Sequence, residues 1–270
     1  MLSNEPYYLK AGMDSDEAFL MLHGLGGGVY EMSPLARELH AAGHSVMAFN
    51  YPGHDVPAQR MPDSQWQDWY GSAETAYREL AAQHQHVSII GFSTGCVLGL
   101  RLASEFMRHQ PVHRLILLSP FLKVRMQWYY LLTPEFYVRR FGRMLRDVPR
   151  SRLPINDPEM ERLARRSCYF QTFNLPSVLS ALDLIEEVHP ELPRIDTPTL
   201  IVQSRRDRIV CPSGAETLMQ RLGSVHKQVH WLENSDHVLL LDTERETVTR
   251  HIRNFIDDTR PEILSAVESA

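Results

Sequence analysis

Short apolar runs, many of them rich in β-branched residues, alternate along this chain with longer segments whose apolar residues recur every three or four positions. The runs are typical of buried strands, and they cover residues 18–22, 45–49, 87–90, 112–118, 199–203 and 226–232. The helical spacing covers residues 31–43, 64–83 with Ser64 or Asp63 as the expected cap, 94–108, a stretch from Pro212 to about Leu222, and 242–258. This alternation predicts an α/β fold with a doubly wound, mostly parallel sheet and helices on both faces.

The alternation stops between residues 121 and 190, where no run is typical of a buried strand. This stretch is rich in aromatic residues and is interrupted by several prolines, and its first fifty residues carry a net charge of +6, which leaves −11 for the rest of the chain. We therefore expect a helical cap insertion over residues 121–190, on a core formed by residues 1–120 and 191–270. Its aromatic side chains either wall an apolar pocket or pack the insertion on the core, and its arginines either attract an anionic group or surface or are solvated.

Composition narrows the class of protein further. The 270 residues, 43% of them hydrophobic, suit one large α/β domain, and the net charge of −5 gives no general basic character for binding nucleic acid. The three cysteines are widely spaced and form no C-x-x-C pair, so that neither a zinc site nor a disulfide framework is indicated, and we expect no metal and no cofactor. The first apolar run is too short to span a bilayer, and we expect a soluble cytoplasmic protein.

A serine stands where the run at 87–90 gives way to helical spacing, in the sequence Gly91-Phe92-Ser93-Thr94-Gly95. The pattern G-x-S-x-G at a strand-to-helix turn is the signature of a nucleophile elbow. Its serine takes a strained backbone conformation, so the residues two positions away on either side must lack bulk. The turn also places the Thr94 N–H at a helix N-terminus, where it can face a developing oxyanion. The alternative is a glycine-rich turn with an incidental serine, because the pattern is short.

A second glycine-rich turn, His23-Gly24-Leu25-Gly26-Gly27-Gly28, follows the run at 18–22. It lacks the Gly-Lys-Ser/Thr ending of a phosphate-binding P-loop, and Val29 stands where a dinucleotide fingerprint needs its third glycine. The turn can still offer the Leu25 N–H as a second oxyanion donor. We interpret His23 as a structural histidine that hydrogen-bonds this loop.

Three residues with complementary chemistry each follow the end of a predicted strand: Ser93, Asp207 and His237. Ligands of open parallel sheets bind outside the carboxyl ends of the strands. A serine hydroxyl is a poor nucleophile at neutral pH and needs a histidine base, whose tautomer a carboxylate fixes. Other candidates stay open at this point: an Asp207 that only pairs with neighbouring arginines, the competing acids Asp236 and Asp242, and the competing bases His54, His226 and His230.

The chain resembles the α/β-hydrolases of the carboxylesterase and monoacylglycerol-lipase-like group over most of its length. The resemblance rests on Leu22-His23-Gly24 with its glycine run, on residues 91–95, on Gln203-Ser204-Arg205-Arg206-Asp207 with Pro212, and on Ser235-Asp236-His237 with Leu241-Asp242. It implies a catalytic triad of Ser93 as nucleophile, His237 as general base and Asp207 as orienting acid. It also implies an oxyanion hole formed by the N–H groups of Leu25 and Thr94. The chain departs from the family at Cys96, where a second glycine is common, and in the weakly matched insertion.

The resemblance and the ordered triad together predict a serine hydrolase that cleaves carboxylic esters of short-to-medium acyl chains through an acyl-enzyme. Candidate substrate-binding residues are the insertion aromatics Trp128, Tyr129 and Phe121. The alternatives are a thioesterase or other acyl hydrolase, and a non-catalytic ligand-binding protein of the same fold. The expected partner is a small acyl ester, and weak contact of the basic insertion with an anionic membrane is a further hypothesis. We make no prediction of the oligomeric state.

Overall fold

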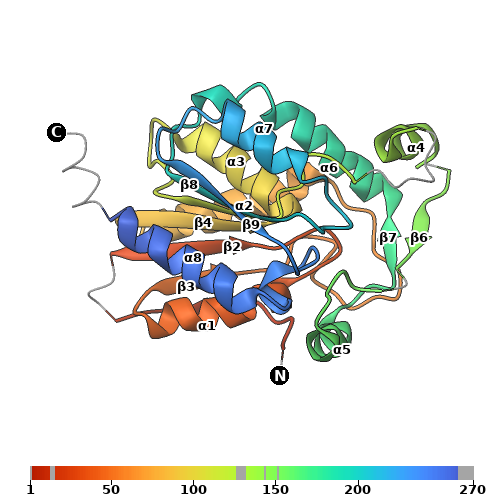
Figure 1. The fold of residues 1–270 in the computed structure, drawn as a ribbon, viewed down its shortest axis with the longest axis horizontal. Coiled ribbons are helices and arrows are strands. Elements are labelled where there is room, and N and C mark those ends of the chain that lie inside the picture. The colour runs from red at the N-terminus through yellow and green to blue at the C-terminus, as the bar shows by residue number, and fades with distance from the viewer. Residues whose placement is uncertain (1, 13–15, 126–131, 143, 151, 261–270) are drawn as a thin grey trace.

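The computed structural model describes residues 2–12, 16–125, 132–142, 144–150 and 152–260. A seven-stranded sheet forms its centre, in the spatial order β1-β3-β2-β4-β5-β8-β9 (Figure 1). Six of these strands are parallel: β2 (Glu17–Leu22), β3 (Ser45–Ala48), β4 (His86–Phe92), β5 (Leu115–Leu118), β8 (Thr199–Ser204) and β9 (Lys227–Leu232). The edge strand β1 (Tyr7–Leu9) pairs antiparallel with β3 and was not predicted. The mostly parallel α/β-hydrolase sheet predicted from the sequence is confirmed.

Helices cover both faces of the sheet (Figure 1). α1 (Ser33–Ala41) and α8 (Arg245–Asp258) pack on one face, and α2 (Trp66–Ala81), α3 (Thr94–Phe106), α6 (Leu175–Val188) and α7 (Ser213–Arg221) pack on the other. Successive residues of β2 point to opposite faces: Leu20 and Leu22 join the core under α2 and α3, while Phe19 and Met21 join the core under α1 and α8. Burial on both faces explains why the strands read as continuous apolar runs.

The order of the strands in the sheet indicates where a ligand site should lie. The chain runs from β2 to β3 on one side and then returns to β4 on the other, so that the order reverses between β2 and β4. Ligands of doubly wound sheets bind at this switch point, outside the carboxyl ends of the strands. The His23 loop follows β2 and the Ser93 turn follows β4, so both glycine-rich turns lie at that point.

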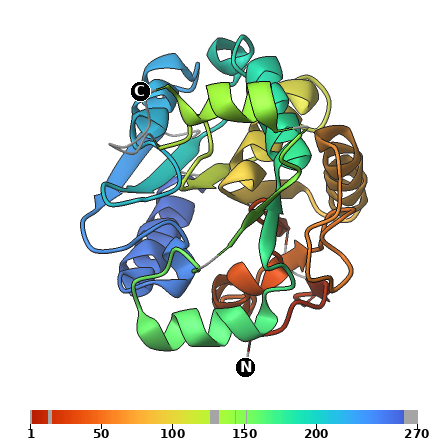
Figure 2. The same ribbon diagram turned by 90° about the vertical axis from the view of Figure 1, so that its right-hand side faces the viewer.

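Between β5 and β8 the chain leaves the core and forms α4 (Pro134–Phe141), β6 (Asp147–Pro149), α5 (Pro158–Ser167) and β7 (Thr172–Asn174). β6 and β7 pair antiparallel as a separate two-stranded sheet that the sequence did not predict. Figure 2 shows α4 and α5 at opposite ends of this layer with the two strands between them. α6, which lies within the predicted insertion, contributes Leu184 and Val188 to the main core. The division into a core and a cap insertion stays a prediction.

Smaller features complete the fold. Short 3-10 helices span Val29–Glu31, Leu192–Arg194 and Leu239–Leu241. The predicted cap of α2 was wrong: the N-cap position is Gln65, and no side chain caps the helix. The Ser64 hydroxyl lies 3.5 Å from Ser177 Oγ of α6 instead. In the described part of the chain, every helix is too short or too polar to cross a bilayer.

Candidate active site

Ser93 occupies the strained turn that the sequence predicts. Its φ of 54° lies in the left-handed region, which side chains other than glycine rarely adopt. A Cβ on Gly91 would come within 2.6 Å of the Cys96 backbone, and a Cβ on Gly95 would overlap the carbonyl oxygen of Leu22. Both glycines are therefore required by close backbone packing around the serine.

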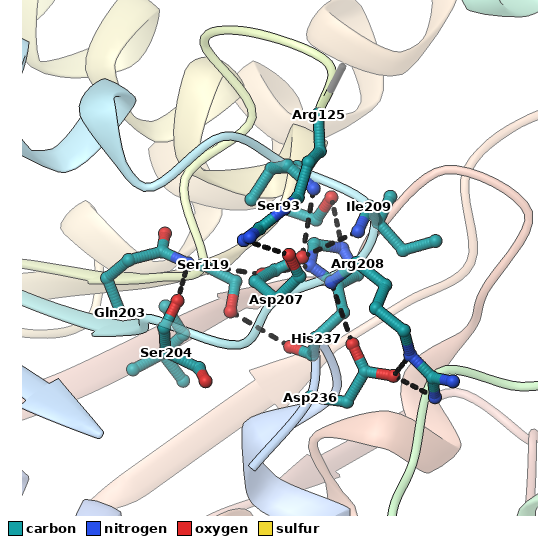
Figure 3. A network of polar contacts seen from close by, with 12 residues as sticks. Ser93, Ser119, Arg125, Gln203, Ser204, Asp207, Arg208, Ile209, Asp236 and His237 are labelled. Carbon is teal, nitrogen blue, oxygen red and sulfur yellow. Dashed lines mark hydrogen bonds and ion pairs between the residues drawn. The ribbon is translucent and has the colours of Figure 1, made fainter. Parts of the chain in front are cut away.

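The structure brings Ser93, His237 and Asp207 together (Figure 3). The Ser93 hydroxyl lies 3.0 Å from His237 Nε2, to which it can donate, and His237 Nδ1 donates to Asp207 Oδ2 at 2.8 Å. Asp207 is fully buried, and Ser93 and His237 are 7% and 5% exposed. This arrangement allows the imidazole to take the serine proton while the carboxylate fixes the ring tautomer and stabilises the imidazolium.

Asp207 is held by the turn that follows β8. Its Oδ1 accepts from the N–H groups of Ile209 and Val210 at 2.8 and 2.9 Å, and its Oδ2 also accepts from Gln203 Nε2 at 3.2 Å. Burial acts to raise the pKa of this carboxyl, but the His237 charge and these N–H donors outweigh burial and keep the pKa below its ordinary value. Asp207 is therefore an ionised acceptor with a fixed orientation.

The competing acids face other partners. Asp236 accepts from the Arg208 N–H at 2.9 Å and forms an ion pair with the Arg208 guanidinium, on the side away from the triad in Figure 3. Asp242 accepts from the N–H groups of Asn156 and Asp236 at 2.9 and 2.6 Å. Asp207 is thus the acid that contacts His237, rather than a surface partner of its neighbouring arginines.

The other histidines make contacts that stabilise the surrounding structure. His54 Nε2 accepts from the Gly26 N–H at 2.9 Å, and burial lowers the pKa of His54 to about 4, which keeps it neutral. His230 is half-buried, with its ring centroid 3.7 Å from that of His251. His23 donates from Nδ1 to the Gly24 carbonyl at 2.8 Å, the structural contact with the loop that the sequence interpretation gives it.

The predicted oxyanion donors Leu25 and Thr94 both line the cavity that contains Ser93. Thr94 is the first residue of α3, so that its N–H belongs to the unpaired, partly positive end of the helix. The loop that carries Leu25 is fixed at Gly26, whose φ is 66°: His54 accepts from its N–H, and Arg150 Nη1 donates to its carbonyl at 2.7 Å. His54 and Arg150, from distant parts of the chain, therefore hold the two peptide groups on either side of Gly26.

Glu31 is a buried acid that no sequence pattern marks as a functional residue. It is 3% exposed and lines the same cavity, and a Cβ on Gly27 would collide with its carboxyl group. Burial raises its pKa to about 7, against the opposing charges of Arg150 and His237 and the N–H groups of Gly24 and Gly28. A carboxylic acid that titrates near neutral pH thus lies beneath the loop of the predicted oxyanion hole.

The cavity beside Ser93 has a volume of about 480 Å³ and is mostly apolar. Phe121, one predicted lining residue, is buried at its wall, while Trp128 and Tyr129 lie outside the described residues. Further apolar lining comes from α4 and α6, and includes Tyr137, Val138, Phe141, Leu175 and Val178. The four-residue spacing of Tyr137 and Phe141 is the sequence signal that predicts a common helix face.

Among the described residues, no group of three or more His, Cys, Asp or Glu side chains is arranged to hold a metal ion.

Comparisons with known proteins agree with this geometry. A family model described as serine aminopeptidase, S33, matches residues 14–244. The chain is 24% identical over 258 residues to a carboxylesterase of Bacillus subtilis, covering 95% of this chain and 98% of the relative. It is 25% identical over 253 residues to a thermostable monoacylglycerol lipase of Bacillus sp. strain H-257, covering 93% of each. A solved structure from work on the metagenome-derived lipolytic enzymes LipS and LipT superposes with a TM-score of 0.82 at 25% identity, over 94% of this chain and 98% of that one.

Proposed function

This chain belongs to the α/β-hydrolase family described as serine aminopeptidase, S33, and on that premise we propose that it hydrolyses carboxylic esters through an acyl-enzyme formed on Ser93. The carboxylesterase and monoacylglycerol lipase among its relatives support an ester as the substrate. The observation that carries the proposal is the chain of hydrogen bonds from Ser93 through His237 to Asp207, at 3.0 and 2.8 Å.

Acylation begins when Ser93 Oγ attacks the ester carbonyl carbon and His237 Nε2 takes the hydroxyl proton. The carbonyl oxygen becomes an oxyanion, which the N–H groups of Leu25 and Thr94 stabilise. Collapse of this intermediate breaks the bond to the alcohol, and His237 gives its proton to the leaving oxygen. Water then attacks the acyl-enzyme by the same steps, releasing the acid and restoring the Ser93 hydroxyl.

The cavity supports an acyl chain of short-to-medium length. Its apolar wall, formed by Phe121 with side chains of α4 and α6, suits a hydrocarbon chain next to Ser93. Burial of each methylene group contributes about 0.8 kcal/mol, so kcat/KM is expected to rise with chain length until the cavity of about 480 Å³ is filled.

A series of p-nitrophenyl esters with straight acyl chains of increasing length, together with a monoacylglycerol, tests the proposal. We expect turnover with an optimum at short-to-medium chains and labelling of the protein by a fluorophosphonate probe. Ser93→Ala should abolish both. Ser104→Ala is the matched control, because Ser104 lies on the same helix and bonds Glu191 at 3.2 Å instead of the triad. Full activity of Ser93→Ala would contradict the proposal.

A further inference from the structure

Three described arginines of the insertion form ion pairs with carboxylates. Arg139 pairs with Asp183 and Glu186, Arg146 with Asp63, and Arg165 with Glu161. Arg150 and Arg152 differ, because both line the cavity beside Ser93 and neither has a carboxylate within ion-pair distance in the described part of the chain. Two guanidinium groups without an ion-pair partner therefore lie at a largely apolar cavity.

Both arginines lie close to β6 in the chain. Val148 of β6 lines the cavity together with Arg150 and Arg152, so this part of the wall holds one apolar and two cationic side chains.

Arg150 contacts the oxyanion loop and an aromatic ring, and it forms no ion pair with the described residues. Its Nη1 donates to the Gly26 carbonyl, its guanidinium lies 4.8 Å above the Phe173 ring, and its Nε is buried without an acceptor. The acid that it influences is Glu31, whose buried carboxyl has a pKa raised to about 7 and is protonated in about half of the molecules at neutral pH. Arg150 is half-buried, and an anion bound beside it would accept charge-assisted hydrogen bonds from its guanidinium.

Arg152 lies two residues before Pro154, on a segment that contacts the residue after His237. The Val238 N–H, next to His237, donates to the Pro154 carbonyl at 3.2 Å, so the segment with Arg152 runs beside the histidine that protonates the leaving oxygen. The segment that carries Arg152 leads into α5. α4, which supplies apolar lining, lies at the opposite end of the insertion from α5 (Figure 2). The acyl chain and the alcohol thus have separate apolar and cationic surroundings.

We propose that Arg150 and Arg152, next to the Glu31 carboxyl, form a subsite for an anionic group, a phosphate or a carboxylate, on the leaving alcohol of the ester. This inference rests on the proposed function and narrows its substrate class. The planar guanidinium fork matches both anions, and the cation at the mouth steers them inward. Glu161, which pairs with Arg165, is the acid whose charge also reaches Arg152.

The test uses one octanoyl chain on three alcohols: glycerol, glycerol 3-phosphate and glyceric acid, with octanoate release as the readout. At low salt, kcat/KM for at least one anionic ester should exceed that for octanoylglycerol about tenfold, as expected for one charge-assisted hydrogen bond. This ratio should shrink as sodium chloride is added, because Arg152 is exposed. Arg152→Gln should lower the ratio several-fold, and Arg166→Gln, an exposed arginine of α5 outside the cavity lining, should leave it unchanged.

The outcomes separate the inference from the function on which it rests. A preference for the phosphate ester alone or the carboxylate ester alone supports the subsite and identifies its anion. Equal kcat/KM for all three esters, or a ratio that Arg152→Gln does not change, overturns the subsite while ester hydrolysis stands. Failure to hydrolyse any of the three esters and p-nitrophenyl octanoate overturns the proposed function and the subsite with it.

Discussion

Glu31→Gln removes the buried acid beneath the oxyanion loop while keeping its size. The pKa of Glu31 is raised from 4.5 to about 7, so the folded protein holds this proton more tightly than the unfolded chain. Its contribution to stability is present below about pH 4.5 and is lost as pH rises to about 7. At 1.36 kcal/mol per pKa unit, the loss between pH 5 and pH 8 amounts to about 2 to 3 kcal/mol. The glutamine side chain cannot ionise, so the variant does not lose this stability as the pH rises.

The free energy of unfolding of both proteins is measured by urea denaturation from pH 5 to pH 8. We expect the difference between Glu31→Gln and the wild type to shift in favour of the variant by about 2 to 3 kcal/mol across this range. Other titrating groups affect both proteins alike and cancel in the comparison. Glu38→Gln, an exposed acid of α1, is the control, and its curve should follow the wild type. Parallel curves for Glu31→Gln and the wild type would refute the assignment of Glu31 as a buried acid of raised pKa.

Three further predictions follow from the site. Asp207→Asn should lower kcat for p-nitrophenyl butyrate by up to about 10⁴-fold with little change in KM, because the carboxylate that orients His237 is lost; full activity would remove Asp207 from the triad. Gly95→Ala should lower the thermal midpoint by about 5 °C or more, because its methyl group overlaps the Leu22 carbonyl; an unchanged midpoint in calorimetry would contradict that packing. Arg150→Met should lower kcat for the same neutral ester about tenfold and KM little, because the Gly26 carbonyl loses its charged donor; a change in KM alone would show that Arg150 does not position the oxyanion loop.

Local sequence patterns predicted the parallel core and the positions of the three triad residues. A strand, a tight turn and a helix follow one another within a few residues around Ser93, and the apolar run at 87–90 and the flanking glycines predict all three. Glycine is needed at position 95 because the backbone there lies against the Leu22 carbonyl. The edge strand β1 and the β6–β7 pair escaped prediction, since three-residue strands without a buried face produce no apolar run. β1 pairs with β3, which lies far along the chain, and β6 pairs with β7, which follows only after α5.

The features of the cavity depend on contacts between distant segments, and the sequence did not reveal them. Glu31 reads as an ordinary acid at a helix start, and only its burial under residues 24–28 raises its pKa. The insertion reads as uniformly basic, but Arg139 and Arg146 pair with acids outside their own elements. Among its described arginines, Arg150 and Arg152 line the cavity. Tertiary packing therefore decides which charges are available to a ligand.

Mass spectrometry of the intact protein tests directly whether Ser93 carries the acyl group during turnover. Acid-quenched samples taken during hydrolysis of p-nitrophenyl butyrate should contain a butyryl adduct that peptide mapping assigns to Ser93, and Ser93→Ala should show neither adduct nor turnover. Turnover with the adduct on another residue, or continued turnover by Ser93→Ala, would contradict the account.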